Sequence, residues 1–423
     1  MANRLQILQK LDWLTIGIYL VFILLGWLNI YAADYNPDHV TSIFDFHTRA
    51  GRQFIWIMGG FVLIVLIYIT DYKVFEAISY IIFGFSSLLL VLVLLVGSVK
   101  NGARSWIDLG FISLQPSEFA KIASCLALSK YLSIKNQKNQ QNKYLFFSCF
   151  FIYIPVVLIL LQNDTGSLLV YFSLILVLYI NGIKTPLFFA ALGFVAVFVL
   201  ALFFPIGVLI TSFILICAVL VYFFRKRMRI VLSIIAVTII IIFEISGTQF
   251  FVNNVLKDHH RKRIEVIINP ESDPKGAGWN TTQSKIAIGS GGFSGKGFLN
   301  GNITKGDFVP EQFTDFIFCT IGEEHGFIGS FFIVVMFVFL LLRLLFLAER
   351  QKSHFAYLYG YSVVSILFFH FLINIGMALG ILPVIGIPLP FFSYGGSSLW
   401  SFTILLFIFI KLDAHRSEVL ARR

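Results

Sequence analysis

The chain has 423 residues, of which 58% are hydrophobic and only 13% are charged, and 48 residues are phenylalanine. Soluble globular chains contain roughly 45–50% apolar and 25% charged residues. This composition therefore excludes a soluble enzyme, a disordered protein and a nucleic-acid-binding protein, and it predicts a polytopic integral membrane protein. The formal net charge of +10 fits the positive-inside bias of membrane loops better than a nucleic-acid partner.

Long apolar stretches recur along the chain, and a helix needs about 20 apolar residues to cross the hydrocarbon of a bilayer. The stretches predict spans at residues 13–33, 53–70, 77–97, 116–133, 144–161, 168–180, 186–204, 207–224, 230–251, within 314–346, 355–379 and 399–412. We therefore expect an all-α polytopic helical bundle of about twelve spans, forming a single transmembrane domain over residues 1–423. The spans at 186–204 and 207–224 would form a hairpin around Pro205.

The distribution of lysine and arginine predicts the orientation of these spans. With the N-terminus in the cytoplasm, the short basic segments at 135–143, 225–229, 343–352 and 411–423 all lie inside, as the positive-inside rule requires. Both termini are then cytoplasmic, and the segments left outside are 34–52, 98–115, 162–167, 204–207, 252–313 and 380–398. This orientation gathers the unusual polar motifs on the outer face.

The first polar motif runs from residue 101 to residue 121 and contains Arg104. Pro116 stands at a predicted helix start, where its missing N–H costs nothing. Glu118 and Lys121 are three residues apart, so they share a helix face and can pair. Such a pair either serves only to ease insertion of the helix or marks a functional site, and ionisable groups inside a span favour the second interpretation.

The second motif, at 162–167, taken alone is only a turn. The third is the long outer loop at 252–313, in which closely spaced glycines allow backbone N–H groups to approach an anion. The polar side chains in and just after this loop that could contact a substrate are Asp273, Gln283, Ser284, Lys285, Lys296, Glu311 and Asp315.

The fourth motif, at 380–398, contains three prolines that interrupt helical structure, together with Ser393 and Ser397. Irregular backbone at membrane depth is tolerated only where protein or a watery cavity satisfies it. The motif is therefore either a packing device or the floor of a cavity. A further polar group, at residues 323–325, is a weaker site candidate near the outer end of the tenth span.

Together these motifs resemble the SEDS family (shape, elongation, division and sporulation). The matching stretches, in family order, are 101–110, 115–121, 162–166, 273–278, 283–297, 310–318, 322–329 and 382–398. The run from Gly386 to Gly396 is more similar to the RodA branch, which serves elongation and cell shape, than to the FtsW branch, which serves division. Family members usually have ten spans, so residues 185–229 would contain an inserted transmembrane hairpin.

Two departures from the family pattern are visible. The stretch that begins at Gln162 has Asn and Thr where the family usually has Pro and Leu. Many members also carry arginine at the position of Ser105, so it stays open whether Arg104 or Ser105 contacts the substrate.

The resemblance implies a peptidoglycan glycosyltransferase in the bacterial cytoplasmic membrane. Its substrate would be lipid II, a disaccharide-pentapeptide on undecaprenyl pyrophosphate, which it polymerises into glycan strands at the outer face. The partner would be a class B penicillin-binding protein that crosslinks the strands. The two other candidate functions are a division-type polymerase and a lipid II flippase without catalysis, and a scaffold that only recruits the synthase is a third alternative.

The reaction needs a base for the attacking sugar hydroxyl and cations for the departing pyrophosphate. Asp273 matches the acidic residue regarded as essential in the family and is our candidate base, with Asp315 and Glu311 as substitutes. The candidate cations are Arg104, Lys121, Lys285 and Lys296. A Mg²⁺ or Mn²⁺ ion could join Asp273 to the pyrophosphate, although the sequence shows no dedicated metal cage. Gln283, Ser284, Glu118, Ser393 and Ser397 would complete the substrate site.

Overall fold

The computed structural model describes residues 10–35, 42–100, 102–108, 110, 113–134, 141–182, 193–194, 197, 200–201, 204–254, 277–306 and 308–417. The chain forms two compact units. One consists of Met1–Asn181 with Asn280–Arg423, and the other is Gly182–Trp279. Each unit is described by itself.

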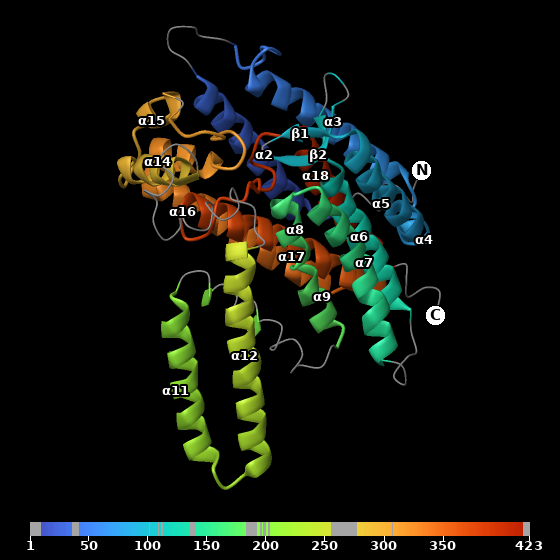
Figure 1. Ribbon diagram of the computed structural model, residues 1–423. Helices are drawn as coiled ribbons and strands as arrows, with labels where there is room; N and C mark the ends of the chain where they lie inside the picture. Colours follow the sequence, from blue (N-terminus) through green and yellow to red (C-terminus); the bar gives the residue numbers. More distant parts are fainter. Residues whose placement is uncertain are drawn as a thin grey trace. The chain divides into compact units, whose positions relative to one another are not determined.

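The larger unit is a bundle of helices (Figure 1). Its first half contains α2 (Trp13–Asp34), α3 (Arg49–Ile69), α4 (Tyr72–Ala77), α5 (Ser79–Val96), α6 (Pro116–Ser133), α7 (Gln141–Leu161), α8 (Thr165–Tyr171) and α9 (Leu174–Ile180). Its second half contains α15 (Asn302–Lys305), α16 (Ile317–Glu349), α17 (His354–Ala378) and α18 (Gly396–Ala414), and most of α14 (Ala277–Ser290) also belongs to it.

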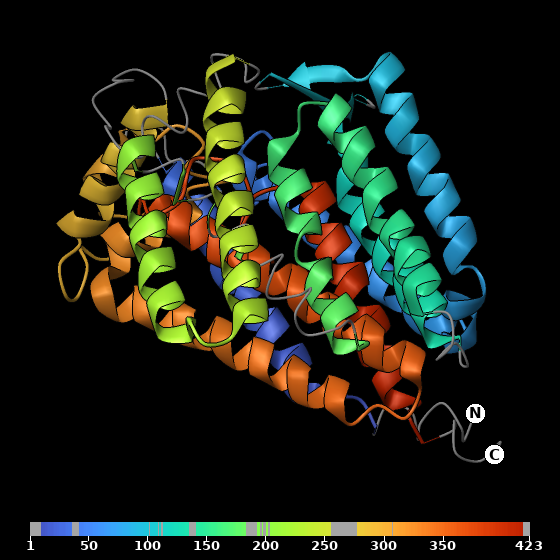
Figure 2. The same cartoon turned by 60° about the horizontal axis from the view of Figure 1, so that its bottom comes forward.

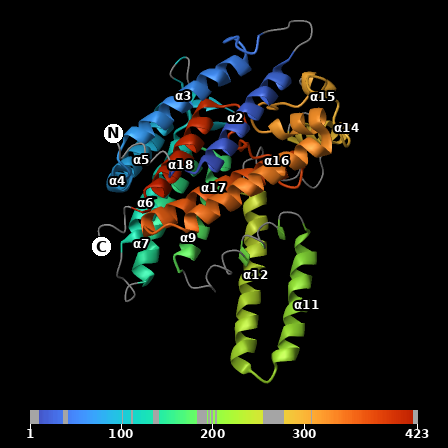
Figure 3. The same cartoon turned by 180° about the vertical axis from the view of Figure 1, so that it is seen from behind.

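Helices α17 and α18 form the centre of this bundle. In the apolar 18-residue stretch of each helix, 67% of the residues of α17 and 83% of those of α18 are buried. The corresponding shares are 22% for α3 and 28% for α5. Helix α6 packs against α5, α7, α17 and α18 (Figure 2), and α3 packs against α2 and α18 (Figure 3). Stacked phenylalanines join three helices: Phe337 of α16 lies 4.3 Å from Phe22 of α2 and 4.9 Å from Phe371 of α17, measured between ring centroids.

The expectation of an all-α fold was wrong in one detail, because a small sheet follows α5. Strands β1 (Ser98–Lys100), β2 (Ala103–Asp108) and β3 (Ser113–Leu114) pair antiparallel in the order β1-β2-β3. Lys100 Nζ lies 2.6 Å from the Asp108 carboxylate. The hydrogen bond from Lys100 holds the pKa of Asp108 well below its usual value. Six-residue β2 is too short and too mixed in polarity to be distinguished from a loop by its sequence.

Helix α16 is kinked at Gly326, whose φ of 61° and ψ of −156° are not helical. A Cβ at this position would lie 2.3 Å from the backbone nitrogen of Gly295, so the close approach of the loop before α15 requires glycine here. The kink therefore fixes that loop against the helix.

The smaller unit contains α11 (Ile206–Phe224) and α12 (Met228–Asn254), which pack against each other as a hairpin. Pro205 precedes α11, as the predicted break requires. Leu209 and Ile245 form a buried apolar cluster with Val197 and Ala201. Most of the predicted span at 186–204 lies outside the described residues, as do most of the residues between 252 and 276.

Among the described residues, eight helices are long and apolar enough to cross a membrane: α2, α3, α5, α11, α12, α16, α17 and α18. Shorter apolar helices cover Phe147–Leu161 and Thr165–Ile180. Helix α6 has 18 residues but contains Glu118, Lys121 and Lys130. A polytopic, mostly helical membrane protein is thus confirmed, whereas the count of twelve spans, the inserted hairpin and the single domain stay predictions.

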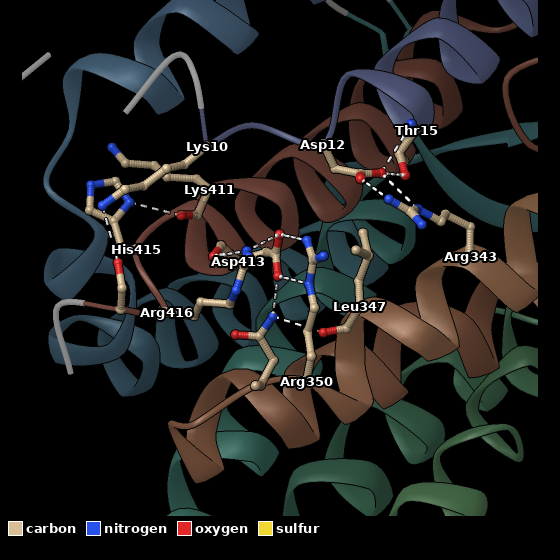
Figure 4. Close-up of polar contacts among 12 residues, drawn as sticks. Lys10, Asp12, Thr15, Arg343, Leu347, Arg350, Lys411, Asp413, His415 and Arg416 are labelled. Carbon is tan, nitrogen blue, oxygen red and sulfur yellow. Dashed lines mark hydrogen bonds and ion pairs between the residues drawn. The ribbon is translucent and has the colours of Figure 1, made fainter. Parts of the chain in front are cut away.

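Ion pairs join the helix ends at one end of the larger unit (Figure 4). Arg350, the C-cap residue of α16, donates to both oxygens of Asp413, which is fully buried near the end of α18. Arg343, two turns earlier in α16, donates to Asp12 at the start of α2. Lys10 donates to Ser417 at 3.2 Å, so the first and last described segments meet here.

Candidate active site at one end of the helix bundle

The predicted pair of Glu118 and Lys121 exists and is buried. Lys121 Nζ lies 2.8 Å from Glu118 Oε1, and each side chain is 3% exposed. The pair lies in the first turns of α6, where Pro116 starts the helix. Ser401 of α18 donates to the second oxygen of Glu118 at 3.0 Å. Both carboxylate oxygens are therefore hydrogen-bonded, as a buried charge requires.

His370 of α17 extends this pair into a chain of contacts that the sequence analysis missed. Lys121 Nζ lies 2.9 Å from His370 Nε2, and His370 Nδ1 lies 3.2 Å from the carbonyl oxygen of Pro388. An ammonium has no lone pair, so Nε2 accepts and Nδ1 carries the proton that is donated to Pro388. A lone histidine in an apolar span was the signal that could have revealed it.

A second polar layer joins the start of α6 to the start of α8. Asp164 is the N-cap of α8 and accepts from Ser167 N at 3.0 Å. The same carboxylate accepts from Gln115 Nε2 at 3.0 Å. Ser117 Oγ lies 3.0 Å from Ser167 Oγ. The motif at 162–167, which alone reads as a turn, is thus a helix cap that fixes the start of α6.

The proline-containing motif at 380–398 is braced by side chains from its neighbours. Asn374 of α17 donates to the carbonyl oxygens of Asp315 and Ile387, at 2.8 Å and 2.7 Å. Ser393 donates to Thr314 O at 2.5 Å and accepts from Leu389 N at 2.8 Å. These hydrogen bonds satisfy backbone carbonyl and N–H groups that have no helical hydrogen-bond partner, because the backbone is irregular here.

Ser397 serves the same purpose beside the sheet. Its hydroxyl donates to Ser113 O at 3.0 Å and accepts from Gln115 N at 3.2 Å. Ser393 and Ser397 are both buried. Their predicted contact with a substrate stays a prediction, and the structure gives each of them a bracing role.

Asp315 faces this motif. A Cβ at Gly386, where φ is +83°, would lie 3.2 Å from Asp315 Oδ2. Glu311 instead is exposed, and its carboxylate accepts from Thr314 Oγ1 at 3.2 Å within its own turn. Of the two alternative candidates for the base role, Asp315 is the one that the structure places against the proline-containing motif.

The candidate cations differ in how accessible they are. Arg104 is exposed on β2, with its backbone N–H donating to Gln162 O at 2.9 Å, while the adjacent Ser105 is 1% exposed. Of these two neighbours, Arg104 is therefore the residue that a substrate could reach. Lys285 is also exposed and lies beside Gly380, where an added Cβ would be 2.6 Å from its Nζ.

Lys296 is already paired. Its Nζ lies 2.6 Å from Glu323 Oε1, and the Glu323 side chain is fully buried. The same carboxylate accepts the first three backbone N–H groups of α15, from Asn302, Ile303 and Thr304, at 2.8–3.0 Å. Glu323 thereby ties the loop before α15 to α16, a role that the sequence analysis did not foresee.

The remaining predicted residues are placed as follows. Ser284 is buried in α14 and donates to Ala378 O at 2.8 Å, and Gln283 beside it is half-buried. Asp273, the candidate base, lies outside the described residues. Within the part of the chain that is described, no group of three His, Cys, Asp or Glu side chains could hold a metal ion. The predicted roles of Asp273 and of a Mg²⁺ or Mn²⁺ ion are therefore untested.

All these contacts lie at the end of the bundle opposite the ion pairs of Asp12 and Asp413. Helix α18 connects the two ends: Ser397 lies in its first turn and Asp413 at its end, so they are separated by about 24 Å at 1.5 Å per residue. The expectation that the motifs gather on one face is confirmed for those that the structure describes. Which side of the membrane this face occupies stays a prediction.

Comparison with known proteins shows which family the chain belongs to. The family model of the cell cycle proteins FtsW, RodA and SpoVE matches residues 12–211 and 206–418. The peptidoglycan glycosyltransferase RodA of Treponema pallidum (strain Nichols) is 32% identical, over 98% of this chain and 100% of its own length. The peptidoglycan glycosyltransferase MrdB of Escherichia coli (strain K12) is 33% identical, over 85% and 84% of the two chains.

Solved structures show the same fold. A chain from "Structural coordination of polymerization and crosslinking by a peptidoglycan synthase complex" superposes with a TM-score of 0.70 at 26% identity, covering 96% of this chain and 98% of that one. The crystal structure of Thermus thermophilus RodA gives 0.63 at 24% identity, covering 96% and 97%. The matches cover nearly the whole sequence, and the chain therefore belongs to the FtsW/RodA/SpoVE family of membrane proteins.

Proposed function

We propose that this protein is an elongation-type peptidoglycan glycosyltransferase that polymerises lipid II at the outer face of the bacterial cytoplasmic membrane. The observation that carries the proposal is the buried chain of contacts from Glu118 through Lys121 and His370 to Pro388. It connects ionisable groups inside the bundle to the irregular motif at 380–398. The named activity of the T. pallidum and E. coli relatives supports the same reaction.

In this reaction a sugar hydroxyl attacks the anomeric carbon that carries the lipid pyrophosphate. A base takes the hydroxyl proton as the new glycosidic bond forms, and the pyrophosphate leaves with the electrons of the broken bond. We assign the base role to Asp273. Arg104 and Lys285 are the exposed cations available to stabilise the leaving group. A Mg²⁺ or Mn²⁺ ion, where one is bound, would add positive charge there.

Glu118 and Lys121 have a different role in this proposal. Their side chains are buried and already hydrogen-bonded, so they position the site rather than contact the pyrophosphate directly. Through His370 they would hold the motif at 380–398, against which Asp315 lies. In this proposal Lys121 is therefore a positioning residue and is not one of the cations that bind the pyrophosphate.

The partner we propose is a class B penicillin-binding protein. The supporting observation is that a similar chain comes from a structure described as a peptidoglycan synthase complex that coordinates polymerisation and crosslinking. The elongation role rests on the sequence run at 386–396, because overall identity does not separate the two branches. The probable peptidoglycan glycosyltransferase FtsW of Buchnera aphidicola subsp. Acyrthosiphon pisum (strain APS) is 31% identical over 96% of the chain.

The experiment that tests the proposal is polymerisation of labelled lipid II by the purified full-length chain in detergent, with and without a class B partner. Long glycan strands are expected. Detergent micelles contain no bilayer to cross, so a flippase would leave lipid II unpolymerised in this assay. Absence of strands in both arms, with the protein folded, would contradict the enzyme and favour the flippase or scaffold. Complementation of an elongation mutant but not a division mutant is the expected outcome for the finer assignment.

A further inference from the structure

The turn that joins α11 to α12 carries four positive charges within five residues (Figure 1). The four side chains, all exposed, are those of Arg225, Lys226, Arg227 and Arg229. We call residues 225–229 the basic tip. Its backbone is a tight turn, in which Arg227 N donates to Phe224 O at 2.8 Å and Val231 N donates to Arg227 O at 3.1 Å. The turn therefore holds the charges together at one end of the hairpin.

The chain supplies no charge that neutralises the basic tip. No aspartate or glutamate occurs in the sequence between Asp164 and Glu244. Among the described residues, no carboxylate forms an ion pair with any of the four basic side chains. The Arg225 guanidinium lies 5.2 Å from the centroid of the Tyr222 ring, a contact that leaves its positive charge in place. The tip is therefore a concentration of positive charge that attracts anions from outside the chain.

The two helices place the basic tip at the level of lipid headgroups. Helix α11 has 19 residues and is about 28 Å long, close to the ~30 Å thickness of the hydrocarbon core of a bilayer. Only 6% of its apolar stretch is buried, so its sides would face lipid. Beside the cations, Tyr222, Phe223 and Met228 are 65%, 75% and 69% exposed. Apolar and aromatic side chains next to cations suit the boundary between acyl chains and headgroups.

The anion present at this level is the phosphate of a phospholipid. A guanidinium donates two parallel hydrogen bonds to phosphate oxygens, and three of the four basic residues are arginine. Near an anionic membrane surface, each lysine or arginine strengthens binding by about fivefold. A zwitterionic headgroup has no net charge to attract such a cluster. Because every residue of the tip is exposed, it contacts the abundant headgroups around it and does not enclose one scarce prenyl-linked lipid.

We propose that the basic tip binds anionic phospholipids of the leaflet that it faces, with Arg225, Arg227 and Arg229 donating to their phosphate oxygens. These lipids would hold the end of the α11–α12 hairpin at a fixed depth. If the charges acted only during membrane insertion, through the positive-inside rule, the inserted protein would show no lipid preference at the tip. The site does not depend on the proposed glycosyltransferase activity or on which side of the membrane the tip occupies.

The test measures which lipids touch the tip of the full-length protein. The photoreactive variant Met228→p-benzoylphenylalanine is reconstituted in nanodiscs that contain equal amounts of phosphatidylglycerol, which is anionic, and phosphatidylethanolamine, which is zwitterionic. After irradiation, mass spectrometry should find at least about fivefold more phosphatidylglycerol adducts. The ratio should fall towards one when salt is raised to about 1 M, where the Debye length is about 3 Å.

The matched control places the same photoreactive residue at Phe243, which is 79% exposed on α12 and lies about 22 Å farther along the helix. Phe243→p-benzoylphenylalanine should give equal adducts with the two lipids. Equal adducts at Met228, or the same preference at both positions, would overturn the proposal. Loss of the phosphatidylglycerol adduct on addition of one equivalent of undecaprenyl pyrophosphate would also overturn it, because the tip would then bind a prenyl-linked lipid.

Two combined variants in the Met228 probe separate charge from other causes. One removes all four charges: Arg225→Gln, Lys226→Gln, Arg227→Gln and Arg229→Gln. The other keeps the charges: Arg225→Lys, Arg227→Lys and Arg229→Lys. The glutamine variant should lose the preference for phosphatidylglycerol and the lysine variant should retain it, whereas an unchanged preference in the glutamine variant would contradict the proposal. The first measurement alters no charge and remains decisive even if the glutamine variant does not insert.

Discussion

Lys121 Nζ and His370 Nε2 lie 2.9 Å apart, although 249 residues separate them in the chain. The contact orders three elements at once, because Lys121 belongs to α6, His370 to α17, and the other nitrogen of His370 donates to Pro388. A protonated histidine would have no acceptor for the Lys121 proton and would place two cations in contact. The geometry therefore requires a neutral imidazole at this position.

The first prediction concerns His370. His370→Ala removes an acceptor from a buried ammonium and should lower the free energy of unfolding by about 1.5–3 kcal/mol. Glycan polymerisation should fall with it. His370→Gln supplies a carbonyl oxygen to Lys121 and should recover stability better than His370→Ala. Thermal unfolding and the polymerisation rate are the measurements, and equal behaviour of the two variants would contradict a role for this hydrogen bond.

The second prediction separates structure from function in the Glu118–Lys121 pair. Lys121→Met leaves the Glu118 carboxylate buried and unpaired, which should cost about 3–5 kcal/mol of stability. The double variant Glu118→Gln, Lys121→Met removes both charges and should regain most of that stability. If the pair positions the site, the double variant folds but does not polymerise lipid II. Recovery of activity together with stability would show that the pair only maintains the fold.

The third prediction concerns the candidate base. Asp273→Ala and Asp273→Asn should both reduce polymerisation by about 10²–10⁴-fold, because neither side chain accepts the hydroxyl proton. Expression and association with the partner should be unchanged. A turn role predicts the opposite pattern, since asparagine is a good turn residue and would be tolerated. Near-normal activity of Asp273→Asn would move the base role to Asp315 or Glu311.

The fourth prediction tests the exposed cations. Arg104→Ala and Lys285→Ala should each raise KM for lipid II by about tenfold, as expected for loss of one charge-assisted hydrogen bond. Lys73→Ala is the matched control, because Lys73 is exposed at the opposite end of the bundle, at the start of α4. An unchanged KM in both site variants would exclude these two residues from substrate binding.

The fifth prediction concerns the pH dependence of the Asp12–Arg343 pair. Burial alone raises the pKa of Asp12, but hydrogen bonds from Arg343 and Thr15 outweigh this effect and hold the folded-state pKa below the usual value of an aspartate carboxyl group. The unfolded chain then takes up the proton first. The stabilisation is present above the unfolded pKa and is lost as the pH falls through the folded one. Asp12→Asn should melt with a weaker dependence on acid pH than the unaltered protein, and parallel melting curves would refute the pair's contribution.

Much of the architecture follows from the sequence because a membrane constrains it strongly. A helix that crosses lipid must be apolar over its whole length, so runs such as Trp13–Asp34 and Ile206–Phe224 are visible without any tertiary information. The pairing of Glu118 with Lys121 was also predictable, since residues three apart on a helix face each other. The family motifs are local in the same sense, and they identified the family.

What only the tertiary structure decided depends on contacts between distant segments. Whether a charge is available or already paired cannot be read from its type: Lys296 is neutralised by Glu323, while Lys285 is exposed. The predicted contact of Ser393 and Ser397 with a substrate stays a prediction, and their hydrogen bonds to the backbone at Thr314 and Ser113 became visible only in the tertiary structure. The roles of His370 and Asp164 are likewise visible only from the elements packed against them. Spacing along one helix fixes which of its own residues meet, whereas burial and hydrogen-bond partners are set by which other helices surround it.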